Sequence, residues 1–537
     1  MRTSLVFCLL TLGGAMAGAL GACVGDEPGT TGTGAPDGAA GNDGSALPDS
    51  GAPDGAGDAD DAGDAGEVEP TPDGGILSVE DFSVHSSFPG GVAKVAFAAD
   101  GSLFVGFTFR GQTSIGGTQL SSDAASDDIG VAKFKPDGKL AWLRRFGGAG
   151  AEALYGLAVD AAGDVYLAGD YRSASIDFEV ARTLGGVSSA AFVAKLAGAT
   201  GAAVKSVTFH KPTVAGGRCD AVAARAGVIA VGCTMDGVAD VTMSTGGTAD
   251  VSPPGSGAGM LFAELDPTSL GALWANGLGS DAGDFVSSVD VTPAGDLVFA
   301  AVSGSASDVA LTDTKGSINV TVRRSPTALI GRLARASGLA SWVKPFGSAT
   351  AGAGLRAQGI ASDMAANIVF CAQLTGTIDI GGKAVTRANP SAPSFEGMVV
   401  AKLRPDGTTV EARSFGGSSD ELVRGIATDR WNNVLVTGRY TSTDFVIDGH
   451  TMPAPAASGN QVLFALKMNP SLVAQWGFGA TTGDGALIQG QGVGAAPSGK
   501  VAYVGIFAGT ADFGDGSPRQ SANAGAGVNA VIVTRSP

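Results

Sequence analysis

The sequence predicts an all-β protein, a seven-bladed β-propeller whose blades each hold four antiparallel strands. Two observations lead to this prediction. A bulky apolar residue followed by small residues recurs at intervals of 58 to 69 residues. Within each interval, runs rich in β-branched and aromatic residues alternate with Gly and Asp turns, which is typical of strands rather than helices. The copies of the phrase begin at Phe88, Phe146, Phe209, Leu278, Phe346, Phe415 and Phe478.

The repeat between residues 146 and 209 illustrates one expected blade. Four short apolar or alternating segments follow one another, at 153–159, 165–169, 191–196 and 204–209. Gly- and Asp-containing turns separate them, so neighbouring segments are expected to pair antiparallel.

The connection between the third and fourth expected strands has a clear turn signature in two repeats. It reads Lys-Pro-Asp-Gly at 135–138 and Arg-Pro-Asp-Gly at 404–407. Pro suits the first turn position and Gly the strained one. Large rings in the following strand would cover the seam between blades. A ligand-stacking role is the alternative, and the regular placement favours packing. The tryptophans concerned are Trp142, Trp274, Trp342 and Trp476.

The two ends of the array predict how the propeller closes. The last repeat ends after its third expected strand, around residues 531–533, and an orphan segment at 76–84 precedes the first repeat. A strand left unpaired at a sheet edge is a liability. We therefore expect residues 76–88 to supply the fourth strand of the blade that starts at Phe478, which gives seven closed blades over residues 76–537.

Several phrases resemble the bacterial β-propeller repeat family often called SBBP. They are FGGAGAEALYGLAVDAAGDVYLAGDY, AFVAKL and FGGSSDELVRGIATDRWNNVLVTGRY. The resemblance covers roughly residues 76–537. It implies a propeller fold and a frequent extracytoplasmic setting, and it carries no common reaction and no catalytic residues.

The N-terminus predicts a lipoprotein signal peptide over residues 1–22. Arg2 supplies the positive end, an apolar stretch follows, and Leu-Gly-Ala-Cys at 20–23 is a lipobox. Cys23 is the expected lipidation site and would anchor the chain in the membrane. An ordinary secretory signal with an incidental cysteine is the alternative. Val24 is not Asp, so we expect an outer-membrane lipoprotein that faces the periplasm or the cell surface.

Residues 23–75 predict a disordered acidic tether. The stretch after Cys23 holds thirteen Asp and Glu residues and no Lys or Arg, within Gly, Ala, Pro, Ser and Thr. Such a segment cannot bury enough apolar surface to offset its ordering entropy. It accounts for most of the net charge of −17. No basic stripe suggests nucleic acid, and we expect a monomer.

Two cysteines predict a disulfide. Cys219 and Cys233 are equidistant from residue 226, the centre of an expected hairpin, so they would face each other on neighbouring strands. The alternative is a pair of small buried thiols. Cys371 lies in an apolar strand and is expected in the core.

Four carboxylates recur six residues after the start of the repeated phrase: Glu152, Asp284, Glu421 and Asp484. Equivalent positions of a propeller lie on one rim, so these groups could form a partial ring for a cation or for a cationic or hydroxyl-rich ligand. The alternative is that each side chain caps backbone N–H groups of its own loop, as acidic residues do in turns. Repetition in each unit favours the alternative.

No motif for catalysis, phosphate binding or metal binding is present, and the three histidines lack metal-ligand spacing. We therefore predict no cofactor. The leading hypothesis is a cell-envelope lipoprotein that presents its propeller as a binding or scaffold module for an unknown envelope protein or glycan. Polar loops such as 110–128 and 383–397 would suit recognition. The alternatives are a propeller enzyme (quinoprotein-like, lyase or glycosidase) acting at the central channel, and a passive structural or adhesion element.

Overall fold

The computed structural model divides the chain into two units, Met1–Glu67 and Val68–Pro537. The predicted signal peptide, Cys23, nearly all of the predicted tether and Asp484 lie outside the described residues. No helix in the described part of the chain is long and apolar enough to cross a membrane. The structure describes residues 75–84, 94–123, 126–174, 176, 178, 189–209, 216–304, 307–323, 326–387, 396–483, 487–521 and 528–537.

The described residues of the second unit form seven large antiparallel sheets, each built on four paired strands, and five small sheets of two or three strands, so the predicted all-β class is confirmed. In six sheets the four strands follow chain order. The first three of these sheets contain β2 (Lys94–Phe97), β3 (Leu103–Arg110), β6 (Asp127–Phe134) and β7 (Leu140–Phe146); β8 (Glu152–Val159), β9 (Val165–Tyr171), β10 (Ala190–Leu196) and β11 (Ala203–Thr208); and β12 (Gly217–Arg225), β13 (Val228–Met235), β16 (Gly259–Leu265) and β17 (Ala272–Gly279).

The next three sheets repeat this arrangement. They contain β18 (Asp284–Val291), β19 (Leu297–Ser303), β22 (Thr327–Leu333) and β23 (Ala340–Phe346); β24 (Gly354–Ser362), β25 (Ile368–Thr375), β28 (Gly397–Leu403) and β29 (Thr409–Phe415); and β30 (Glu421–Thr428), β31 (Val434–Tyr440), β34 (Val462–Met468) and β35 (Ala474–Gly479).

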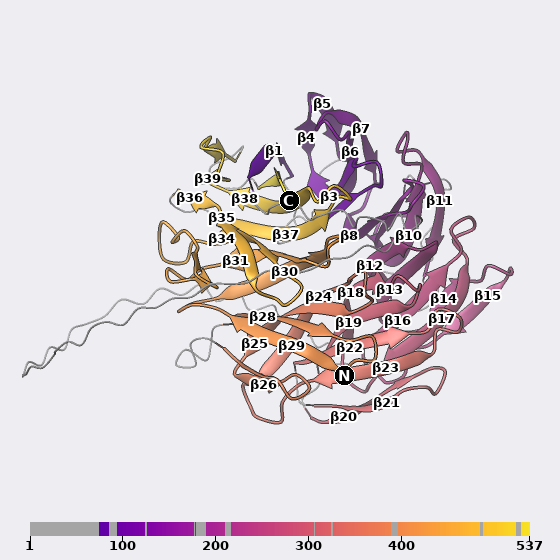
Figure 1. Cartoon of the computed structure of the whole chain (residues 1–537). Coiled ribbons are helices and arrows are strands. Elements are labelled where there is room, and N and C mark those ends of the chain that lie inside the picture. Colours follow the sequence, from indigo (N-terminus) through magenta and orange to yellow (C-terminus); the bar gives the residue numbers. More distant parts are fainter. Residues whose placement is uncertain are drawn as a thin grey trace, which may run out of the picture. The chain divides into compact units, whose positions relative to one another are not determined.

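The remaining sheet joins the two ends of the second unit. Its strands are β37 (Leu487–Ala495), β38 (Val501–Ala508), β41 (Asn529–Arg535) and β1 (Ile76–Ser83). β1 pairs antiparallel with β41, with Phe82 opposite Ala530. In Figure 1 the indigo strand β1 accordingly lies near the C-terminus, at the edge of the yellow sheet. Without β1, β41 would present an unpaired edge.

The first strand of each sheet, here called the inner strand, contacts the inner strand of the next sheet. The series runs through β2, β8, β12, β18, β24, β30 and β37, and β37 contacts β2 again. The described sheets therefore surround a common centre, as the blades of a propeller do.

Second and third strands are apolar on both faces because a sheet packs against each of their sides. All residues of β9, β19, β28 and β34 are buried. Inner strands alternate more, as in β18, because one side faces the centre. This burial explains why the sequence shows continuous apolar runs in the middle of each repeat.

The tryptophans of the fourth strands join neighbouring sheets, which confirms their interpretation as packing residues. The indole N–H of Trp142 in β7 donates to the carbonyl oxygen of Gly198 at 3.1 Å. Trp274 in β17 donates to Arg335 O at 2.7 Å, and Trp342 in β23 donates to Pro405 O at 3.0 Å. Each acceptor lies in the turn between the third and fourth strands of the following sheet.

The loops between second and third strands hold structure that the sequence analysis did not assign. Residues 110–128 contain a hairpin whose two turn glycines, Gly116 and Gly117, have φ of 54° and 78°. Such positive φ values suit the two-residue turns of hairpins. The additional short strands in these loops are β4 (Gln112–Ile115), β5 (Thr118–Ser121), β14 (Ala239–Thr242), β15 (Thr248–Val251), β20 (Val309–Asp313), β21 (Asn319–Val322), β26 (Thr377–Asp379), β27 (Ala384–Thr386), β32 (Val446–Ile447), β33 (His450–Thr451), β39 (Thr510–Asp512) and β40 (Arg519–Gln520). A further short strand, β36 (Thr481–Thr482), precedes β37 and pairs with β39.

Candidate functional site

A cavity of about 590 Å³ lies at the centre of the sheets. All seven inner strands contribute to its walls. Ligand cavities of proteins fall in the range of roughly 300–1,000 Å³. The cavity is therefore the candidate functional site.

Six inner strands carry a β-bulge at the same place. One extra residue interrupts the pairing of each inner strand with its second strand. A bulge re-aims a side chain and strengthens the local twist. All six extra residues line the cavity, and we call them the bulge ring. They are Tyr155, Asp220, Ser287, Gln358, Arg424 and Gln491.

The residue after each bulge is small because neighbouring inner strands approach closely there. A Cβ atom at Gly156 would lie 2.8 Å from the backbone nitrogen of Val222, and one at Gly425 would lie 3.2 Å from the Cα of Gly492. Both contacts join adjacent sheets. The set consists of Gly156, Ala221, Ser288, Gly359, Gly425 and Gly492. Small residues thus let the inner strands converge on the cavity.

Sequence reasoning missed this ring, although a signal was present. A polar residue followed by a small one recurs in the inner strands, as in Gln358-Gly359 and Gln491-Gly492. Strand β2 breaks the pattern. Lys94 stands three residues before the end of its strand, as Gly156 does in β8, and Lys94 also lines the cavity.

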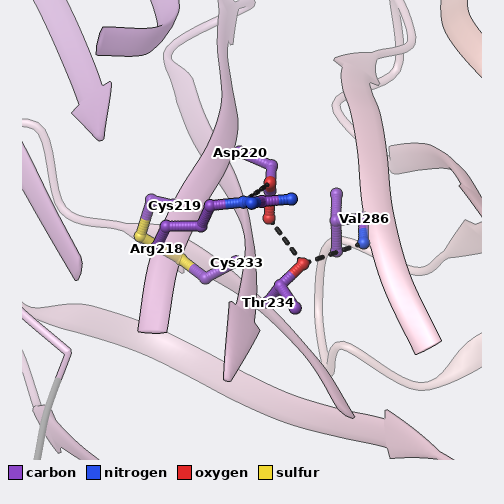
Figure 2. The surroundings of a disulfide bond; sticks show 6 residues. All are labelled: Arg218, Cys219, Asp220, Cys233, Thr234 and Val286. Carbon is purple, nitrogen blue, oxygen red and sulfur yellow. Dashed lines mark hydrogen bonds and ion pairs between the residues drawn. A yellow bond between two sulfur atoms is a disulfide. The ribbon is translucent and has the colours of Figure 1, made fainter. Parts of the chain in front are cut away.

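One wall of the cavity carries Asp220, whose carboxylate has partners on both oxygens. Arg218 Nε lies 2.5 Å from Asp220 Oδ1, and Thr234 Oγ1 donates to Oδ2 at 2.6 Å. Thr234 also accepts the backbone N–H of Val286 from the next sheet at 3.1 Å (Figure 2). Burial raises the pKa of Asp220, while the charge of Arg218 opposes this shift.

Cys219 and Cys233 are joined by a disulfide directly beside this bulge (Figure 2). They face each other in register on β12 and β13, with 3.8 Å between their Cα atoms. The bond ties the inner strand to its neighbour where the pairing is about to be interrupted at Asp220. Cys371 is a buried free cysteine in β25.

The opposite wall is basic. Lys94 on β2 and Arg424 on β30 flank β37, which lies between them in the series of inner strands. Burial lowers the pKa of Lys94 to about 8, with the charge of Arg424 adding to the shift and Asp220 opposing it. Burial also lowers the pKa of Arg424, and Glu396 opposes that shift.

Arg225 spans one end of the cavity. It lies at the end of β12, and its Nη1 donates to Ser362 O on β24 at 3.0 Å. The strand β18 lies between these two in the series, and Arg225 reaches its Val291 O at 3.3 Å. Asp290 on β18 in turn accepts the Ser362 N–H at 2.6 Å. This network constrains the end of the cavity farther from the bulge ring.

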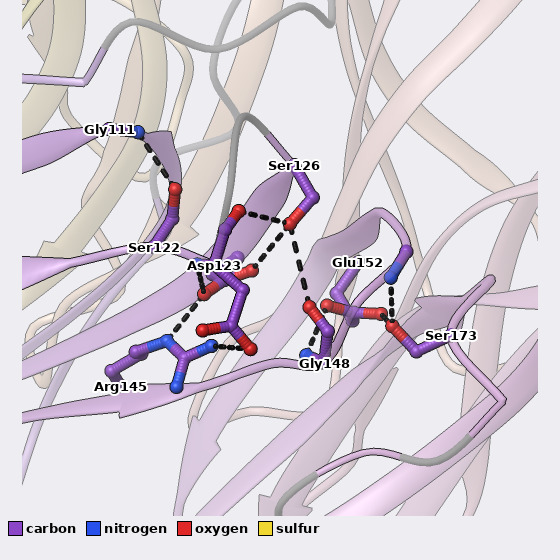
Figure 3. Close-up of polar contacts among 10 residues, drawn as sticks. Gly111, Ser122, Asp123, Ser126, Arg145, Gly148, Glu152 and Ser173 are labelled. Carbon is purple, nitrogen blue, oxygen red and sulfur yellow. Dashed lines mark hydrogen bonds and ion pairs between the residues drawn. The ribbon is translucent and has the colours of Figure 1, made fainter.

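The repeated carboxylates bind their own loops rather than the cavity. Glu152 accepts the backbone N–H of Gly148 at 3.0 Å and the hydroxyl of Ser173 (Figure 3). Glu421 accepts the N–H of Gly417 at 3.0 Å and the hydroxyl of Ser442 in the same way.

Asp284 repeats this loop contact, because it accepts both the N–H and the hydroxyl of Ser280 at 2.7 Å. These three side chains are buried and do not line the cavity. Desolvation raises the pKa of Glu152 and of Glu421 to about 7. The geometry of these three residues is that of loop caps.

Within the described ranges, no group of three or more His, Cys, Asp or Glu side chains is placed to hold a metal ion. The bulge ring and Lys94 supply hydrogen-bonding and charged side chains to the cavity.

No protein-family model and no curated protein matches the chain. Among solved structures, it is similar to the WD40 domain of Neurospora crassa Pan2, at 10% identity and a TM-score of 0.30, over 67% of this chain and 94% of that one. It is also similar to the quinohemoprotein alcohol dehydrogenase of Comamonas testosteroni, at 11% identity and a TM-score of 0.34, over 82% of this chain and 76% of that one. Similarity at this level says nothing about activity.

Proposed function

We propose that the chain is a cell-envelope lipoprotein that presents a seven-bladed β-propeller as a binding module, with the central cavity as its ligand site. The observation that carries the proposal is the bulge ring. Six sheets each turn one extra side chain toward a cavity of about 590 Å³. Bulges that re-aim side chains occur next to functional sites, and all six re-aimed side chains line this one cavity.

The blade count and closure in this proposal are supported by the seven described sheets and by the pairing of β1 with β41. The resemblance to SBBP repeats supports an extracytoplasmic setting. The proposed location at the membrane rests on the lipobox at 20–23 and on Cys23 as the lipid anchor, with residues 24–75 as a spacer. The partner is an envelope protein or a glycan, and the chain acts as a monomer.

The alternative of an enzyme at the central channel lacks a specific observation in its favour. Glu152 and Glu421 have pKa values raised to about 7, a range useful for a general acid. However, both carboxyl groups are held by loop donors and lie outside the cavity lining. A passive structural or adhesion element would leave the polar bulge ring without a role.

The anchoring part of the proposal is tested with Cys23→Ser in a bacterial host. The wild-type protein should label with a fatty-acid probe and sediment with outer membranes, and the variant should do neither. A wild-type protein that is secreted unlabelled would refute the anchor.

The binding part is tested by a thermal-shift screen with neutral, anionic and cationic sugars and amino acids. A ligand of the cavity should raise the melting temperature of the wild type and not that of Gln358→Trp, which fills the ring. Lys139→Trp, on an outer turn, is the matched control and should respond like the wild type. If every compound shifts the melting temperature of Gln358→Trp and of the control alike, the result favours the passive structural alternative.

A further inference from the structure

The basic wall of the cavity has an excess of positive charge. Lys94 and Arg424 both line the cavity and lie close enough for each charge to act on the other. Among the described residues, neither forms an ion pair with a carboxylate. The acidic groups whose charges oppose the lowered pKa values are Asp220 for Lys94 and Glu396 for Arg424.

These two carboxylates are already engaged. Asp220 is bound by Arg218 and Thr234. Glu396 acts on Arg356 and Arg439 as well as on Arg424. The local charge of Lys94 and Arg424 is therefore not neutralised within the cavity. Two cations facing the same space are favourable for an anion and costly without one.

The strand between the two cations, β37, presents the Gln491 side chain to the cavity. Its glycines let the neighbouring strands approach, since a Cβ at Gly494 would lie 3.5 Å from Val95 O. The Gln491 amide nitrogen donates to Gln489 at 3.3 Å, which leaves its carbonyl oxygen to accept a hydrogen bond. The space in front of β37 thus offers two cations and one acceptor.

The rest of the bulge ring offers neutral hydrogen-bonding groups. Tyr155 lines the cavity, and its phenol hydroxyl can both donate and accept a hydrogen bond. Ser287 donates to the carbonyl of Ala357 at 2.8 Å and keeps its own lone pairs. Gln358 adds an amide that both donates and accepts. Such mixed donors and acceptors suit the hydroxyl groups of a sugar better than they suit a second charged group on the ligand.

We propose that the cavity binds an acidic monosaccharide, whose carboxylate lies between Lys94 and Arg424 and whose hydroxyl groups bond to the bulge ring. The carboxylate takes charge-assisted hydrogen bonds, which are the strong ones. The cavity of about 590 Å³ has room for one sugar ring. This inference rests on the proposed binding function and adds the class of ligand.

Calorimetric titration of the full-length protein with D-glucuronate tests the inference, with D-glucose and inorganic phosphate as comparison ligands. Glucuronate should bind, and Lys94→Gln or Arg424→Gln should each weaken it about tenfold or more, since each removes a charged donor. Lys139→Gln, on an exposed turn, is the matched control and should bind as the wild type does. Circular dichroism of each variant separates lost binding from lost folding.

A pH series separates a direct role of Lys94 from a structural one. Lys94 faces Arg424 on β30 and Asp220 on β12, and its pKa is about 8. Glucuronate affinity of the wild type should therefore fall between pH 7 and pH 9. Lys94→Arg keeps its charge over this range and should keep its affinity.

Three outcomes would overturn the assignment: glucose binding as tightly as glucuronate, phosphate binding in place of glucuronate, or glucuronate binding that ignores both substitutions. If the thermal-shift screen still finds a neutral or cationic ligand that Gln358→Trp abolishes, the binding function stands and the acidic-sugar assignment fails. If Gln358→Trp abolishes the binding of no compound, both the binding function and the acidic-sugar assignment fail.

Discussion

At the scale of single residues, buried charges are placed where the sheets meet the turns of their neighbours. The third strands carry a basic residue at equivalent positions, such as Lys402 and Lys467. Lys402 Nζ lies 3.0 Å from Asp363 and donates to Pro470 O in the next sheet at 3.1 Å. Lys402 thus joins a carboxylate of its own sheet to a turn of the following one, and Lys467 pairs with Asp429 of its own sheet.

The pair of Lys467 and Asp429 is the most buried of these, with both side chains inaccessible and 3.4 Å between them. We expect Lys467→Met to lower the free energy of unfolding by about 3–5 kcal/mol, because it leaves the Asp429 charge without its partner. The double variant Lys467→Met/Asp429→Asn should lose less than Lys467→Met alone. Urea unfolding measures both, with Lys139→Met as an exposed control. A loss below 1 kcal/mol for Lys467→Met would contradict the expectation.

The loop carboxylates predict how stability depends on pH. Burial raises the pKa of Glu152 and Glu421 from 4.5 to about 7 in the folded state. Folding therefore favours their protonated forms, and this contribution is complete below pH 4.5 and lost as pH rises through 7. The expected loss is on the order of 3 kcal/mol for each group.

Unfolding by urea at pH 5 and pH 7.5 checks this prediction. Glu152→Gln/Glu421→Gln should lose less stability than the wild type between the two pH values. The exposed Asp137→Asn serves as the control and should follow the wild type. Identical pH dependence of all three proteins would mean that the two glutamates ionise normally.

At the scale of elements, the contact between neighbouring sheets depends on whether the following sheet supplies a hydrogen-bond acceptor for the tryptophan. Trp142 finds Gly198 O in the turn of the next sheet, and that oxygen also accepts Lys133 Nζ at 3.1 Å. For Trp476, the following sheet has the ends of β41 and β1 in place of a turn. Its indole N–H has no acceptor among the described residues, and Arg535 stacks on its ring at 5.0 Å.

This difference predicts unequal effects of the same substitution. Trp142→Phe removes a hydrogen bond, whereas Trp476→Phe removes an N–H that has none in the described structure. We expect Trp142→Phe to cost about 1 kcal/mol more than Trp476→Phe. Both side chains are 7% exposed, so the loss of packing is comparable. Equal losses in urea unfolding would show that the indole bond contributes nothing.

At the scale of the whole second unit, the ring of sheets depends on the N-terminal strand. β1 covers the edge of β41, and Phe82 is buried in the contact. The two ends meet, since the N–H of Ser536 donates to Gly75 O at 2.8 Å. Backbone pairing thus joins the first and last described strands of the second unit.

Deletion of residues 75–84 should expose the β41 edge and cost about 3 kcal/mol or more, from the loss of Phe82 packing alone. The shortened protein should also self-associate, as light scattering after size exclusion can show. A circular permutant that joins Pro537 to Gly75 and opens the 135–138 turn keeps every strand pair and should stay monomeric. A monomeric deletion variant of unchanged stability would refute the role given to β1.

The sequence by itself determined the strand class, the repeat, the four-strand pattern and the seam tryptophans. Each of these depends on residues within one repeat, where alternation and turn residues act locally. The hairpins between second and third strands escaped prediction because strands of two to five residues offer too few alternating positions to stand out, although one face is buried, as in β4 and β14.

The tertiary structure decided the site. Lys94 and Arg424 are 330 positions apart in the sequence. More than one whole repeat separates Asp220 from each of them. Their shared cavity exists because seven inner strands converge, and because a bulge turns one side chain of six of these strands toward the centre. A bulge is a property of register between two strands, so alternation along one strand cannot reveal it. The repeated glutamates are conspicuous in the sequence, but in the folded protein they accept N–H groups of their own loops and lie outside the cavity lining.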